Sequence, residues 1–166
     1  MFQEKSISRL ILLHVIAILF AVTNLINIDI AGINKVMPLF DLMIIFYFAV
    51  FRSTFGIWFV FILGVWNDGL NGNPLGTTSL CYIILIKFFI LLNNRLVIKE
   101  NFIQVWKQFV IFCLLFLLLK LAILYLFNQV HYGISTIITQ FILSSSFYVL
   151  MHRLFDHLSQ KLLGGF

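Results

Sequence analysis

The stretch LGVWNDGLNGNPLGTTSL, residues 63–80, sets one acidic residue and four glycines between two strongly apolar segments. Its glycines and Pro74 favour a particular backbone turn, and the segments on either side have the composition of membrane-spanning helices. A carboxylate in such surroundings is costly unless it has a partner or a function, so Asp68 needs an explanation. The stretch predicts two membrane helices joined by a turn of defined shape.

The composition of the whole chain excludes a soluble domain. Of its 166 residues, 62% are hydrophobic and 10% are charged, whereas soluble domains carry about 25% charged residues. Because a spanning helix needs about 20 residues, the chain has room for about six spans and little else. We therefore expect residues 1–166 to form a single integral membrane domain, an all-α bundle of six transmembrane helices.

Six apolar runs mark the expected spans, and the glycine-rich turn separates the third from the fourth. They cover residues 9–26, 38–51, 54–66, 75–92, 105–127 and 134–151. The second and third runs are short for a bilayer of about 30 Å. They could therefore also form one long helix with Arg52 at its middle.

The distribution of basic residues favours six spans over five. Six spans with a cytoplasmic N-terminus leave Lys35 outside and place on the cytoplasmic side Lys5, Arg9, Arg52, Arg95, Lys99, Lys107, Arg153 and Lys161. Five spans would move the last five of these outside, against the positive-inside bias. The net charge of +5 is then a sign of topology and not of nucleic-acid binding. We expect a multi-pass protein with both termini in the cytoplasm and the glycine-rich turn at the outer face.

Two ionisable residues, Asp68 and Lys120, have more than one plausible role. Asp68 either caps the turn after the third span, as aspartates commonly do, or pairs with a lysine to fix helix packing. Lys120 lies inside the fifth span, where it either snorkels outward or meets Asp41 or Asp68 on a neighbouring helix. The sequence leaves an intramembrane ion pair between Asp68 and Lys120 as one alternative.

The residue patterns of enzymes and metal sites are missing from the sequence. Cys81 and Cys113 lie in apolar runs, and no cluster of cysteine and histidine has metal-ligand spacing. Residues 144–146 are serines, which in membrane helices usually permit close packing. No nucleophile elbow, Walker loop or zinc-protease motif is present. We expect no catalytic residue, no cofactor and no metal.

The stretch from Pro38 through Leu80 resembles the rod shape-determining protein MreD family. An apolar run from Pro38 to Arg52 is followed by a helix ending in LGVWNDGL and by NPLGTTSL at the start of the next span. The residues of this turn that we interpret as a partner-binding or structural motif are Gly64, Asp68, Gly69, Gly72, Pro74, Leu75 and Gly76.

This resemblance implies a location, a fold and partners. MreD-like proteins lie in the bacterial inner membrane, and their six-helix fold is similar to the S component of energy-coupling-factor transporters. They act with the single-span protein MreC in the elongation complex, which contains the actin-like MreB, a RodA-type glycosyltransferase and a class B penicillin-binding transpeptidase.

The resemblance thus implies a scaffold that binds MreC and supports peptidoglycan synthesis and rod shape. The alternative is a vitamin-uptake protein of the S-component kind. A solute pocket would require several convergent polar groups on the outer loops, and these loops are short.

Overall fold

The computed structural model describes residues 2–23, 37–93, 101–127 and 133–164, and its regular elements in these ranges are all helices. In chain order they are α1 (Phe2–Thr23), α2 (Phe40–Ile45), η1 (Phe46–Phe51), α3 (Ile57–Asn71), α4 (Thr77–Asn93), α5 (Phe102–Leu126), α6 (Ile134–Ser159) and η2 (Gln160–Gly164). Elements η1 and η2 are short π-helical segments. The all-α class predicted from the composition is confirmed. Of the residues that carry the topology prediction, Lys35, Arg95 and Lys99 lie outside the described ranges.

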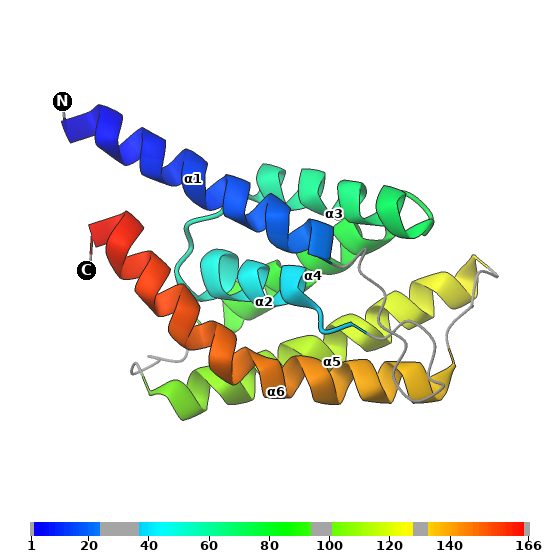
Figure 1. The fold of residues 1–166 in the computed structure, drawn as a ribbon. Coiled ribbons are helices and arrows are strands. Elements are labelled where there is room, and N and C mark those ends of the chain that lie inside the picture. The colour runs from blue at the N-terminus through cyan, green and yellow to red at the C-terminus, as the bar shows by residue number, and fades with distance from the viewer. Residues whose placement is uncertain (1, 24–36, 94–100, 128–132, 165–166) are drawn as a thin grey trace.

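The helices form a bundle whose two chain ends lie together. Figure 1 shows the N- and C-termini at one end of the bundle and the turn between α3 and α4 at the opposite end. Helix α3 packs on α4, α4 on α5 and α5 on α6, while α1 contacts α2. The turn is therefore held at the far end of the molecule from both termini.

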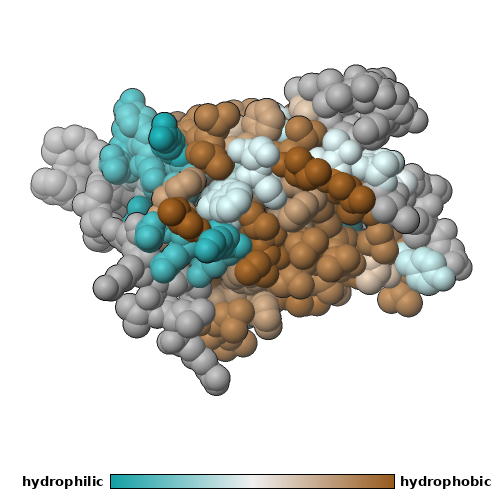
Figure 2. Space-filling model, turned by 90° about the horizontal axis from the view of Figure 1, so that it is seen from below, coloured by the Kyte–Doolittle hydropathy of each residue, from teal (hydrophilic) through white to brown (hydrophobic). Residues whose placement is uncertain are grey.

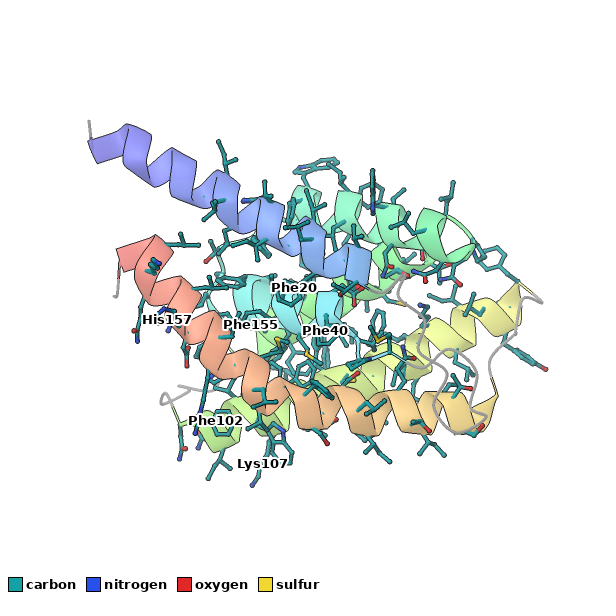
Figure 3. The ribbon with its side chains drawn as sticks, viewed as in Figure 1. Phe20, Phe40, Phe102, Lys107, Phe155 and His157 are labelled. Carbon is teal, nitrogen blue, oxygen red and sulfur yellow. The ribbon has the colours of Figure 1, made fainter. Side chains whose placement is uncertain are left out.

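The centre of the bundle is the short segment α2–η1. Its residues 41–50 are all buried, with at most 4% of any of them exposed. The ring of Phe46 in η1 lies within 5.1–6.4 Å, between centroids, of the rings of Phe89, Phe109, Phe112 and Tyr148. Figure 3 shows Phe20, Phe40 and Phe155 meeting where α1, α2 and α6 converge. Aromatic side chains from six elements thus fill this core.

The chain breaks between the second and third apolar runs. The backbone N–H of Arg52 donates to the carbonyl of Tyr47 at 2.9 Å, which closes η1. Ser53 then adopts φ 50°, a left-handed conformation that a continuing helix does not contain. Helix α3 begins at Ile57 after Gly56, whose backbone is extended. The chain therefore does not run as one long helix through Arg52.

The surface of the bundle is largely apolar. Helix α5, at 25 residues, is the one described helix that is long and apolar enough to cross a membrane. Its length is about 37 Å, more than the hydrocarbon thickness of about 30 Å. Shorter apolar helices cover Leu10–Thr23, Phe40–Phe51 and Thr77–Leu92. Figure 2, a view onto α5 and α6, shows hydrophobic residues over most of this face and hydrophilic ones toward the end with the termini.

Candidate functional site

Helices α3 and α4 approach each other so closely at Gly64 that no side chain fits there. A Cβ atom built at Gly64 would lie 2.6 Å from the Cα of Ser79 and 2.7 Å from its backbone nitrogen. The Ser79 hydroxyl donates to the carbonyl of Phe61 on α3 at 2.9 Å. Small residues at such crossings let membrane helices pack backbone to backbone. Gly64 therefore fixes the distance between the two helices.

Asp68, one helical turn after Gly64, links α3 to the start of α4. Its side chain is fully buried and accepts hydrogen bonds from the backbone N–H of Gly76 at 3.0 Å and of Thr78 at 2.9 Å. The hydroxyl of Thr78 donates to the same carboxylate. Because the first N–H groups of a helix have no partner within it, a carboxylate placed there caps the helix and interacts favourably with its dipole. Asp68 thus caps the helix that follows its own.

The turn between the two helices needs two of its glycines for their backbone conformation. Gly72 ends α3 with φ 68°, and its N–H donates to the carbonyl of Asp68. Gly76 adopts φ 95° just before α4 begins. Pro74 accepts a hydrogen bond from the N–H of Thr77 at 3.2 Å. Between them, Leu75 is 73% exposed at the tip of the molecule. The other motif glycine, Gly69, has ordinary space around it, with Leu75 Cδ2 4.0 Å from a built Cβ.

Lys120 lies near this hairpin without a direct salt bridge to Asp68. Its ammonium group is 5.9 Å from the ring centroid of Phe116, and its positive charge acts on the Asp68 carboxyl. The salt bridges found among the described residues both involve Asp156. The hydrogen bonds of Asp68 thus go to the α4 terminus, and Lys120 contributes at longer range.

A second buried carboxylate, Asp41 on α2, lies next to the hairpin; the sequence named it as a possible partner of Lys120 and not as a site residue. It is fully buried and accepts hydrogen bonds from the amide of Asn67 at 2.6 Å and from the hydroxyl of Tyr82. Asn71 in turn donates to the side chain of Asn67 at 2.6 Å. The other Asp41 oxygen, Oδ1, has no hydrogen-bond partner within the described part of the chain. Its position as a charged residue inside an apolar run is the signal that could have made Asp41 a candidate site residue.

A third polar cluster lies at the end of the bundle that holds the termini. Asp156 accepts a hydrogen bond from the hydroxyl of Tyr47 and pairs with the guanidinium of Arg52 at 3.9 Å. The Nε2 atom of His152 lies 3.4 Å from the same carboxylate. Burial lowers the pKa of the His152 imidazole, which lies past the predicted span 134–151, and the nearby Asp156 opposes that shift. This cluster joins η1 to α6.

The three clusters are built to hold helices together. Asp68 bonds to the end of a helix, Asp41 bonds to a side-chain amide, and Asp156 pairs with a positive charge. The free cysteines Cys81 and Cys113 are buried. In the ranges that the structure describes, no three His, Cys, Asp or Glu side chains could jointly hold a metal ion. The arrangement can stabilise a fixed surface, and the α3–α4 hairpin presents such a surface at the end remote from the termini.

Comparison with known protein families matches residues 4–158 to the family described as rod shape-determining protein MreD. The match covers nearly the whole chain and includes the complete α3–α4 hairpin. Neither the curated proteins nor the solved structures contain a match to this chain.

Proposed function

We propose, from the premise that this chain belongs to the rod shape-determining protein MreD family, that it is an inner-membrane scaffold of the bacterial cell-shape complex. The family has a role in rod shape determination, is membrane-associated and is part of the rod-shape complex with MreC. In our proposal the chain binds MreC directly. Through MreC it supports the peptidoglycan synthesis carried out with MreB, the RodA-type glycosyltransferase and the class B transpeptidase.

The observation that carries the proposed docking surface is the outer face of α3. Trp58, Ile62 and Trp66 are 81%, 62% and 55% exposed, and their four-residue spacing puts them on one side of the helix. Transmembrane helices associate through close packing, and large aromatic side chains give much contact area for little lost entropy. We therefore assign the transmembrane helix of MreC to this face, next to Leu75 at the tip of the turn.

The internal bonding of the hairpin supports this assignment because a docking face must keep its shape. The cap made by Asp68 and the crossing at Gly64 fix α3 on α4, and the charge of Lys120 adds to this at longer range. We further propose that six helices span the membrane, as in the S components, with both termini in the cytoplasm. Their common position at one end of the bundle supports that topology.

We propose no enzymatic activity for this chain, in keeping with a shape-determining family. Uptake of a vitamin, the alternative that the sequence left open, is not favoured, because the matched family is named for shape determination.

The proposal is tested by depletion and by recovery of the partner complex. Cells that depend on this chain for their shape should round up when it is depleted, as seen by microscopy. For the docking face, Trp66→Ala and Leu75→Ala should reduce the amount of MreC that co-purifies. The matched control is Leu150→Ala, a 65% exposed residue on α6. If rods persist on depletion, or if all three variants recover equal amounts of MreC, the proposal is wrong.

A further inference from the structure

A cavity of about 410 Å³ opens at the end of the bundle that holds the termini. It lies between η1, the start of α5 and the last part of α6, away from the α3–α4 hairpin. Its volume is in the range of small-ligand pockets, about 300–1,000 Å³. Its walls are of two kinds, one charged and one apolar.

Among the described residues that line the cavity, the charged ones carry more positive than negative charge. Two guanidinium groups, those of Arg52 and Arg153, and one carboxylate, that of Asp156, line it. Asp156 is already matched inside the protein, because it pairs with Arg52 and accepts the hydroxyl of Tyr47. Arg153 is exposed on α6 and adds a charge that Asp156 does not balance. A guanidinium presents paired donors that suit the oxygens of a phosphate.

The apolar wall continues into the hydrophobic surface of the bundle. Val105 is buried at the base of the cavity, and Phe102 and Val149 are partly exposed at its edge. Next to them on the outside are Ile103, 56% exposed, and Leu150, 65% exposed. Figure 2 shows this face changing from hydrophilic at the terminal end to hydrophobic along α5 and α6. A ligand that fits must therefore be anionic at one end and apolar at the other.

We propose that this cavity binds an anionic phospholipid, with the phosphate at Arg153 and Arg52 and an acyl chain along Val149 and the adjoining surface of α5 and α6. Basic pockets between transmembrane helices on the cytoplasmic side of a membrane are suited to lipid head groups. The leaflet assigned here, the cytoplasmic one, rests on the proposed topology. The binding itself does not depend on MreC, so the two proposals fail separately.

The test uses the full chain purified in a neutral detergent with three additives: phosphatidylglycerol, phosphatidylcholine and inorganic phosphate. Thermal unfolding and native mass spectrometry report binding. We expect phosphatidylglycerol to raise the melting temperature and to remain bound, and the other two additives to do neither. Arg153→Ala should weaken binding of phosphatidylglycerol about tenfold, as the loss of one charged hydrogen-bonding group does.

Matched variants separate the cavity from the general surface. Lys107 is an exposed cation on α5 that projects away from the bundle and does not line the cavity (Figure 3), so Lys107→Ala should bind the lipid like the unaltered chain. Val149→Trp should block the acyl wall, whereas Ile84→Trp, at an exposed apolar site on α4 that does not line the cavity, should not. Circular dichroism of each variant checks that it is folded.

Four outcomes would overturn the proposal. Equal stabilisation by phosphatidylcholine would show that the head-group charge is not recognised. Equal binding of inorganic phosphate would assign the cavity to a small soluble anion. Equal effects of Arg153→Ala and Lys107→Ala would reduce the interaction to surface charge, and normal binding by Val149→Trp would move the lipid elsewhere.

Discussion

Substituting Gly64 by alanine tests whether the α3–α4 crossing is as close as the structure has it. The added Cβ would lie 2.6 Å from the Cα of Ser79, whereas carbon atoms rest at about 3.5–4.0 Å. The helices would therefore have to separate by about 1 Å. Overpacking of this kind costs about 1–3 kcal/mol, and loss of the Ser79 hydrogen bond to Phe61 adds about 0.6 kcal/mol.

Part of this destabilisation is offset, because alanine stabilises a helix by about 1 kcal/mol relative to glycine. We expect Gly64→Ala to lower the free energy of unfolding by about 0.6–2.6 kcal/mol. The matched control is Gly69→Ala on the same helix, where the nearest atom to the new Cβ is 4.0 Å away. That variant should be unchanged or more stable by about 1 kcal/mol.

The assay is thermal unfolding of the full chain in detergent, followed by circular dichroism. Ser79→Gly in the Gly64→Ala background should restore stability only in part, because the clash involves the backbone of residue 79 as well as its hydroxyl. If Gly64→Ala and Gly69→Ala melt at the same temperature, the close crossing and the reasoning built on it are refuted.

Three further changes probe the other polar groups. Thr78→Val removes the hydroxyl that donates to Asp68 while leaving the backbone donor in place, so it should destabilise the chain by about 1–2 kcal/mol in chemical denaturation; no loss would show that the hydroxyl does not contribute. Tyr82→Phe takes a donor from the buried α2 carboxylate and should cost about 1–3 kcal/mol, whereas Tyr125→Phe, at a 71% exposed site, should melt like the unaltered chain. Because burial lowers the pKa of His152, its neutral form is favoured in the folded state, so the stability of the chain should decline as pH falls below about 6.5. The stability of His152→Gln should decline less over the same range. An identical pH profile for the two proteins would contradict this.

Much of the helical pattern could be predicted from the sequence, because apolar runs and glycine-rich turns are local signals. The limits of the helices could not. The third run was expected to end at Trp66, yet α3 continues to Asn71. Asn67, Asp68 and Asn71 have the composition of a loop, but Asn67 donates to Asp41 on α2 and Asp68 accepts from the start of α4. Local composition cannot reveal partners that come from other helices.

The candidate site divides in the same way. The glycine and aspartate pattern predicted a turn of defined shape, and the structure has a turn between α3 and α4 in which Gly72 and Gly76 adopt left-handed conformations. Asp68 caps α4 because the turn brings the backbone N–H groups of Gly76 and Thr78 to its carboxylate. The sequence left this role open. The bonding of Asp41 to α3 and α4 depends on how α2 is placed in the bundle, for which the sequence holds no local signal.

The cap that Asp68 provides has a consequence for how the protein is made. In the proposed six-span topology neither α3 nor α4 is complete alone, since the carboxylate of the earlier segment would enter lipid without donors and the later segment would begin with unmatched amide groups. The two segments are therefore expected to leave the insertion machinery as a pair, already bonded to each other. The nascent chain would then wait at the translocon until Thr78 had emerged.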